Sequence, residues 1–138
     1  MTSLTLTKHH GLGNDFLVVF HPGVDDLAAL ARRLCDRHRG IGADGLLVAE
    51  SAEGRAARMI LFNADGTRAE MSGNGIRCFA QALAARRGDM GDQLILTDAG
   101  DRLVVLTETD DPSTIEAAVE MGEVSTIAEP EGWAALGC

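Results

Sequence analysis

The segment from Ile76 to Arg87 is the part of the sequence that most constrains the fold. A helix drawn over it has almost no polar face, because apolar residues stand on every side: Ile76, Cys78, Phe79, Ala80, Ala82, Leu83, Ala84 and Ala85. A helix that is apolar nearly all round must be surrounded by protein. Gly88 follows directly and can end it. We therefore expect a central buried helix at about Ile76–Arg87, with the other elements built around it.

Short apolar segments on both sides of this helix predict strands. Leu4 and Leu6 alternate with threonines, as in a half-buried strand. Further strands are expected at residues 16–20, 46–51, 57–62, 93–97, 102–107 and 115–122. Those at 93–97 and 102–107 flank the turn DAGD and predict a hairpin. The tail from residue 125 onward has no clear period.

A second helix, with one apolar side, is expected over residues 27–38. Apolar residues recur at i, i+3, i+4 and i+7 from Leu27, and Cys35 extends this stripe into the core. Asp25 or Asp26 can cap the helix, and Gly40 can end it. Several strands, one helix wrapped by them and one flanking helix indicate an α+β domain.

Composition limits the possible partners. The 138 residues suffice for one domain, and the formal net charge is −9 without a basic block. This charge argues against nonspecific binding to nucleic acid or to anionic membranes. The sequence contains no apolar run of about eighteen residues and no leader pattern, so we expect a cytoplasmic protein. Three cysteines and four histidines show no metal-type spacing, so we expect reduced thiols and no metal site.

Three polar turns adjoin apolar strands: GLGND at 11–15, NADG at 63–66 and SGNG at 72–75. Each should lie at a sheet end, where glycines let backbone N–H groups approach a ligand closely. SGNG also leads into the buried helix, whose N-terminus attracts a carboxylate. Asn14, Asn63 and Asn74 can pair with a substrate that carries carboxylate and ammonium groups. Alternatively, these are common turn residues with a structural role, and Ser72 is only a helix cap.

Four segments together resemble the N-terminal half of diaminopimelate epimerase: HHGLGNDFLVV, RHRGIGADGLL, FNADGTRAEMSGNGIRCFA and VEMGE. They occur in the family's order and spacing. The resemblance implies the epimerase fold, in which a mixed sheet wraps around a central helix. It also implies a cofactor-independent isomerase of lysine and cell-wall precursor synthesis, which interconverts LL- and meso-diaminopimelate. In this family two cysteines face the α-carbon from opposite sides, because inversion needs a base and an acid on opposite faces.

The resemblance assigns roles to particular residues. Asn14 and Asn63 would contact the substrate, and Gly73 and Asn74 would bind its α-carboxylate at the helix N-terminus. The turn at Asp44–Gly45 would line the distal side of the site. Cys78 follows the arginine of the motif and is expected to pack on the buried helix rather than to react.

Ser72 stands where the family motif has a cysteine. A helix N-terminus can lower a thiol pKa from about 8.5 into the neutral range. It cannot do so for a serine hydroxyl without a partner base. We keep two hypotheses: Ser72 takes part in proton transfer, or it only caps the helix and binds ligand.

The resemblance also implies a domain arrangement. Residues 1–123 correspond to the N-terminal epimerase domain, and 124–138 to the start of an interdomain segment or tail. The second domain and its cysteine have no counterpart here, since the context of Cys138 lacks the expected glycine-rich turn. The expected partners are a zwitterionic amino acid and a second epimerase domain or homodimer partner. The alternatives are an inactive epimerase-like binding domain and another isomerase of the proline racemase or phenazine type.

Overall fold

A computed structural model describes residues 5–11, 13–111 and 114–120, together with the backbone of 133–136. The described residues contain two helices, α1 (Leu27–Cys35) and α2 (Gly73–Arg87). The strands are β1 (Thr5–Gly11), β2 (Asn14–Phe20), β3 (Gly45–Glu50), β4 (Ala57–Asn63), β5 (Arg68–Ala69), β6 (Gln93–Thr97), β7 (Gly100–Glu108), β8 (Ile115–Glu120) and β9 (Trp133–Leu136).

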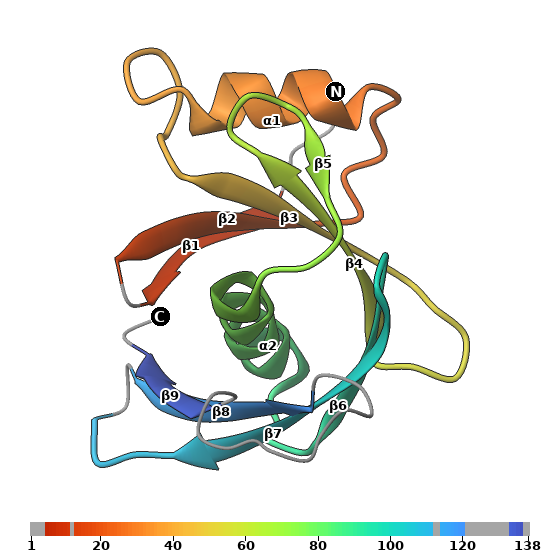
Figure 1. Cartoon of the computed structure of the whole chain (residues 1–138), viewed down its shortest axis with the longest axis vertical. Coiled ribbons are helices and arrows are strands. Elements are labelled where there is room, and N and C mark those ends of the chain that lie inside the picture. The colour runs from red at the N-terminus through yellow and green to blue at the C-terminus, as the bar shows by residue number, and fades with distance from the viewer. Residues whose placement is uncertain (1–4, 12, 112–113, 121–132, 137–138) are drawn as a thin grey trace.

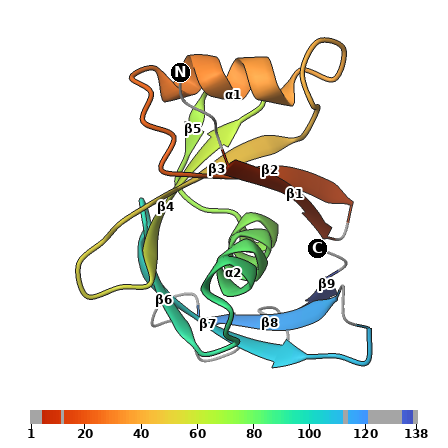
Figure 2. The ribbon, with the colours of Figure 1, turned by 180° about the vertical axis from the view of Figure 1, so that it is seen from behind.

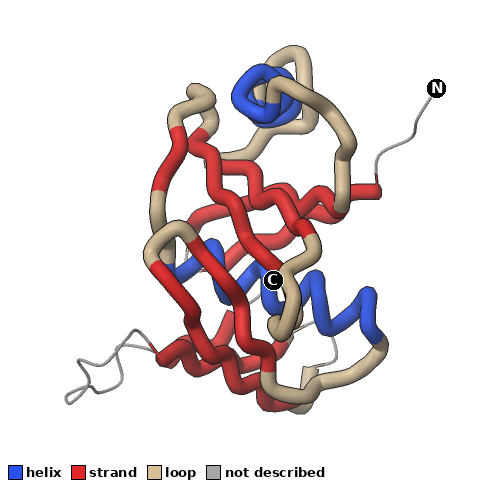
Figure 3. The backbone as a smooth tube through the Cα atoms, turned by 90° about the vertical axis from the view of Figure 1, so that its right-hand side faces the viewer, coloured by secondary structure: helices blue, strands red, loops and turns tan. Residues whose placement is uncertain are grey.

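The strands form one curled, mixed sheet. Their order is β1-β2-β3-β4-β6-β7-β8-β9, with the short β5 paired to β4. The pairs β2/β3 and β4/β6 are parallel and the other pairs are antiparallel. Figure 1 shows the sheet curving around α2, and the side view in Figure 3 shows strands in front of and below this helix. The predictions of an α+β domain and of a hairpin at 93–107 are confirmed.

The core inside the curl is made by α2 and the strands that face it. Nine residues of α2 are buried, and Ile76, Cys78, Phe79 and Ala80 are fully inaccessible to solvent. They pack against apolar side chains from β2, β3, β4, β6, β7 and β8. Gly88 ends the helix at φ 75°, and its N–H donates to Ala84 O, as a left-handed cap requires.

The N-terminal end and the polar residues of α2 differ from expectation. The helix begins at Gly73, three residues before Ile76, because the Ser72 side chain caps it. It also carries a polar stripe, Asn74, Arg77 and Gln81, at i, i+3 and i+7. Arg77 Nε donates to Ala117 O of β8, while Gln81 Oε1 lies 2.7 Å from His9 Nδ1 of β1. The stripe therefore links α2 to strands from both halves of the curl.

The helix α1 lies on the outside of the sheet, on the side away from α2 (Figure 2). It packs with β2, β3 and β4 in a second core, so β2, which lies between β1 and β3, is buried on both faces from Phe16 to Phe20. Asp26, rather than Asp25, caps α1 and accepts from Ala29 N at 3.0 Å. Cys35 is buried in this core, as expected.

The helix α1 ends at Cys35, earlier than the expected end near Gly40. The Asp36 carboxylate accepts the backbone N–H groups of His38 and Arg39 at 2.8 and 3.1 Å. This local hydrogen bonding competes with helix continuation. A glycine is then needed at position 40, because a Cβ there would lie 2.1 Å from Arg33 O.

Two short strands were missed by the sequence prediction. β5 folds back on β4 through the NADG turn, and β9 pairs with β8 in the tail where no period was visible. The last two residues of the strand expected at 115–122 lie outside the described residues, as do Leu4 and most of the segment 124–138.

Candidate functional site

The polar turns meet at one edge of the sheet. Asn14 opens β2, Gly45 opens β3 and Asn63 closes β4. The register aligns Phe16 with Gly45, and Gly45 with Asn63. The three strand ends are therefore adjacent, as the sequence predicted for turns at a sheet end.

The N-terminus of α2 reaches the same edge. Asn74 Nδ2 donates to Asn14 Oδ1 at 3.0 Å, which joins the first and third polar turns. Ser72 Oγ accepts from Gly75 N at 2.9 Å and satisfies one of the N–H groups of the first turn. The N–H groups of Gly73 and Asn74 have no acceptor within the described part of the chain. Among the described residues, two backbone donors are thus left without an acceptor at the positive end of the helix dipole.

Asn63 is held within its own turn. Its Nδ2 donates to Thr67 Oγ1 at 3.0 Å, and its backbone N–H donates to Thr67 O at 2.7 Å. The turn is tied to the Asp44–Gly45 turn by the bond from Ala64 N to Asp44 O at 3.1 Å. Of the three asparagines, Asn14 and Asn74 touch each other, while Asn63 lies at the end of β4, with β3 between it and Asn14.

A charged network supports this edge and was not predicted from the sequence. Arg37 binds both carboxylate oxygens of Asp15, at 2.8 and 3.2 Å, and one oxygen of Asp44 at 3.2 Å. The Arg37 guanidinium holds the pKa of Asp15 well below its usual range. Lys8 lies 3.5 Å from the same carboxylate. An available signal was the presence of charged residues inside or beside the motifs GLGND and RHRGIGADG.

An open depression of about 480 Å³ lies beside this network. It is lined by Lys8, His10, Gly13, Asn14, Asp15, Arg37 and Asp44. Positively and negatively charged side chains face the depression, together with the side-chain amide of Asn14. Such a surface suits a small ligand that carries both an anionic and a cationic group.

Ser72 has the geometry of a cap. Its side chain is half-buried, and Gly75 N–H is its hydrogen-bond partner among the described residues. No described histidine bonds to it: His9, which α2 contacts, is bound to Gln81 and Thr7. Within the described chain, then, Ser72 has no base that would activate its hydroxyl.

The two described cysteines are core residues. Cys78 on α2 is inaccessible to solvent and packs among apolar side chains, in agreement with the expected packing role. Burial raises the pKa of Cys35 to about 11, so this thiol stays protonated at neutral pH. Cys138 lies outside the described residues.

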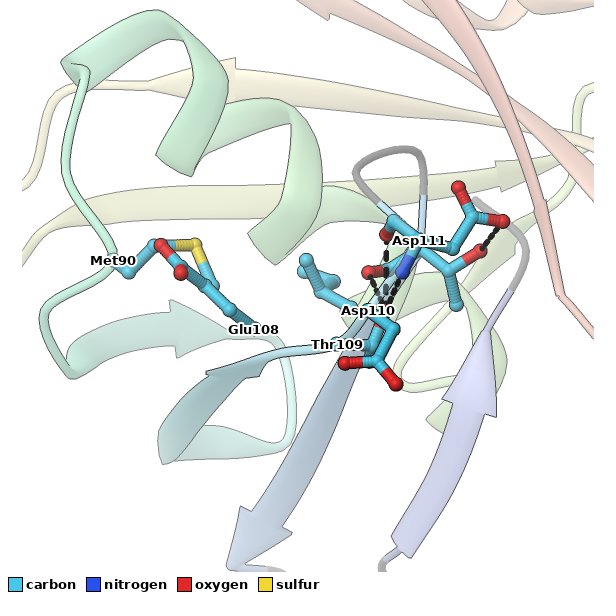
Figure 4. Close-up of a pocket in the computed structure, with 7 residues that line it drawn as sticks. Met90, Glu108, Thr109, Asp110 and Asp111 are labelled. Atoms are coloured by element: carbon cyan, nitrogen blue, oxygen red, sulfur yellow. Dashed lines mark hydrogen bonds between the residues drawn. The ribbon is translucent and has the colours of Figure 1, made fainter.

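A second depression, of about 430 Å³, lies near the other end of α2 (Figure 4). It is bordered by Met90, just beyond the helix, and by residues around the β7–β8 connection, among them Glu108, Asp110 and Asp111. Thr109 and Asp111 bond mainly within this connection. Since α2 has 15 residues, its ends are about 22 Å apart, and this depression is remote from Ser72.

Two other features are absent from the described part of the chain. No group of three or more histidine, cysteine, aspartate or glutamate side chains in that part of the chain is arranged to hold a metal ion. Neither described helix is long and apolar enough to cross a membrane.

Comparisons with known proteins identify the family of this chain. A sequence model of diaminopimelate epimerase matches residues 6–127. The diaminopimelate epimerase of Acetivibrio thermocellus is 38% identical over 132 residues, covering 93% of this chain and 46% of the relative. That of Caldanaerobacter subterraneus is 56% identical over 78 residues, covering 56% of this chain and 28% of the relative. The chain thus spans about half or less of the length of these relatives.

Solved structures with low sequence identity share the fold. A probable proline racemase from Agrobacterium radiobacter superposes with a TM-score of 0.65 at 18% identity, over 84% of this chain and 41% of the other. A phenazine biosynthesis protein of the PhzF family from Bacillus anthracis gives a TM-score of 0.64 at 18% identity, over 86% and 41%. With the sequence match covering most of its length, the chain belongs to the diaminopimelate epimerase family.

Proposed function

We propose that this chain supplies one half of the active site of a cofactor-independent amino-acid epimerase that interconverts LL- and meso-diaminopimelate in the cytoplasm. Residues 1–123 would be the N-terminal domain of the epimerase fold, with α2 as its central helix, and 124–138 would begin the connection to a second domain. The second domain, or a homodimer partner, would supply the opposite wall of the site.

The observation that carries this proposal is the pair of available N–H groups at Gly73 and Asn74. A substrate α-carboxylate bound there would accept two backbone hydrogen bonds at the positive end of a 15-residue helix. As the α-proton leaves, negative charge spreads onto this carboxylate, and the same donors stabilise it. Asn14 and Asn63 lie at the ends of β2 and β4, on the same edge of the sheet, and would orient the rest of the substrate.

The role of Ser72 follows from its chemistry. A hydroxyl without a partner base does not remove an α-proton at neutral pH, but it can donate a hydrogen bond or a proton. Ser72 would therefore serve as a cap and as a proton relay on its face of the substrate: its hydroxyl gives a proton to the α-carbon while it takes one from water, and the reverse reaction returns the proton by the same route. Proton removal would depend on a base from the other half of the site.

One observation favours a second function, an epimerase-like domain that binds amino acids without catalysis. The Ser72 hydroxyl is already engaged with Gly75 N–H, and the described residues bring no base to it. The solved neighbours of the proline racemase and phenazine type support the shared fold only, and the sequence match favours diaminopimelate as the ligand.

A two-part experiment tests the proposal. Diaminopimelate is titrated into 15N-labelled protein, and backbone resonances are followed; we expect the largest shifts at Gly73 and Asn74, while Gly54 on a remote turn stays fixed. In parallel, uptake of solvent deuterium at the α-carbon is measured by mass spectrometry, with the chain alone and with an added C-terminal epimerase domain. Binding without exchange in both samples would favour the inactive binding domain, and no shift at the helix N-terminus would refute the proposed site.

A further inference from the structure

We propose that Asp44 is a positioning residue that fixes the orientation of two side-chain amides, Asn14 and Asn74, and thereby makes the site prefer a ligand with an ammonium group. The effect on ligand choice rests on the proposed function. The orientation itself is a property of the protein and can be measured without a ligand.

Asp44 is held in one position by its neighbours. Its Oδ2 accepts from Asp15 N at 3.0 Å, and its Oδ1 accepts from Arg37 Nη2 at 3.2 Å. In return, Asp44 N donates to Asp15 O at 2.9 Å and to Asp15 Oδ1 at 3.0 Å. Arg37 is itself anchored by its two bonds to Asp15. The carboxylate therefore presents a fixed acceptor, Oδ2, beside Asn14.

This acceptor determines which way the Asn14 amide faces. Asn14 Nδ2 donates to Asp44 Oδ2 at 3.3 Å. A carboxylate accepts hydrogen bonds and donates none, so the reversed amide would set its oxygen against another oxygen. Asn14 Oδ1 must then point away from Asp44, and it accepts from Asn74 Nδ2 at 3.0 Å.

The orientation of the Asn14 amide in turn determines the orientation of the Asn74 amide. Because Asn14 offers an oxygen, Asn74 must use its NH2 group for the contact, and its Oδ1 has no partner within the described residues. With Asn14 reversed, Asn74 would offer its oxygen to Asn14 and would keep only N–H groups for a ligand. The fixed carboxylate thus leaves an amide oxygen at the start of α2, which is an acceptor for an ammonium group.

The test compares diaminopimelate with pimelate, a dicarboxylate of the same chain length that lacks both ammonium groups. Both affinities are measured by calorimetry for the wild type, for Asp44→Asn, and for the matched control Asp101→Asn. Asp101 is also an aspartate bound by an arginine, Arg55, but it lies on β7. The side-chain 15N–1H resonances of Asn14 and Asn74 are recorded for each protein.

An asparagine at position 44 can offer either its oxygen or its NH2 group, so it no longer dictates the direction. We expect Asp44→Asn to lower the preference for diaminopimelate over pimelate by about tenfold, as for the loss of one hydrogen bond to a charged group. The side-chain resonances of Asn14 and Asn74 should move or broaden, while the control leaves both the ratio and these resonances unchanged. An unchanged ratio together with unmoved resonances in Asp44→Asn would overturn the proposal.

Two further outcomes separate the proposal from the proposed function. If the wild type binds neither compound, the proposed function fails. The positioning role is still tested by the side-chain resonances of Asn14 and Asn74: if they do not move in Asp44→Asn the role is refuted, and if they move it is supported. If Asp44→Asn does not fold, Asp44→Ser takes its place, since a hydroxyl can donate or accept and therefore no longer dictates the direction of the Asn14 amide. The same shift in ratio and in resonances is then expected, and its absence refutes the positioning role.

Discussion

Replacing Ser72 by cysteine should lower the stability of α2 and introduce a reactive thiol. Ser72 Oγ accepts from Gly75 N at 2.9 Å, and this bond caps a helix that carries nine buried residues. Sulfur is a weak acceptor. Removal of a serine N-cap typically costs about 1 kcal/mol, so Ser72→Cys and Ser72→Ala should each lower the free energy of unfolding by about this amount. For a domain of this size we expect a fall in Tm of about 3–5 °C.

The thiol in Ser72→Cys should titrate below the usual cysteine pKa of about 8.5, because it stands at the positive end of α2. The rate of alkylation by iodoacetamide, measured from pH 5 to 10 in a Cys138→Ala background, gives this pKa. Cys35 and Cys78 are buried and should not interfere. A lowered pKa would support Ser72 as the position of the family's catalytic thiol.

The matched control is Asp26→Ala, which removes the cap of α1, where the Asp26 side chain accepts from Ala29 N at 3.0 Å. It should lower the stability to a similar degree without adding a reactive thiol. Urea denaturation followed by circular dichroism measures all three variants. If Ser72→Ala is as stable as the wild type, or if the new thiol titrates at or above 8.5, the reasoning from the cap and the dipole is wrong.

Three other outcomes follow from the contacts described above. Gly40→Ala should lower the free energy of unfolding by about 3 kcal/mol in urea denaturation, because its Cβ would lie 2.1 Å from the backbone oxygen of Arg33. Burial lowers the pKa of His9 from 6.5. The unfolded chain then binds more protons than the folded one, so the free energy of unfolding falls as the pH drops below about 6.5. His9→Gln should make the melting temperature less dependent on pH in thermal melts between pH 7.5 and 5. Cys35, whose pKa is raised to about 11, should resist alkylation in the native protein and react after denaturation, as read by mass spectrometry.

The parts of the fold that could be predicted are those set by local patterns. Continuous apolar runs such as Phe16–Phe20 identify strands whether or not their partners are known, and the hairpin at 93–107 needs only a short turn. The end of α1 could not be found this way. Its apolar stripe continues toward Gly40, but the Asp36 side chain captures the N–H groups that the next turn would use.

The polar turns of the site could be predicted from the sequence, but the contacts between their residues could not. The motifs place Asn14 and Asn74 in polar turns, and the strand pattern predicts that such turns lie at sheet ends. The network of Asp15, Arg37 and Asp44 depends on the parallel register of β2 and β3. Parallel pairing joins residues about thirty positions apart, and no local pattern encodes that register.

The residue types in the first turn of α2 bear on the proposed carboxylate site. Glycine and asparagine are poor helix formers, and each glycine costs about 1 kcal/mol relative to alanine. The presence of glycine at position 75 has a structural explanation. A Cβ there would lie 3.1 Å from Ser72 Cβ and 3.2 Å from Ser72 Oγ, and would crowd the side chain that caps the helix. At Gly73 the nearest atom to an added Cβ would be Nη1 of Arg77, at 3.3 Å, so this side chain would have to shift slightly.

Arg77 also adds positive charge beside an N-terminus that is already positive, which a helix start optimised for stability would avoid. These features are unfavourable for the helix alone, yet each favours a bound anion: an uncovered N–H at Gly73, an amide at Asn74 and a guanidinium close by. The burial of the remainder of α2 allows the domain to tolerate this start. The composition of the turn therefore supports the proposed binding of a carboxylate at this N-terminus.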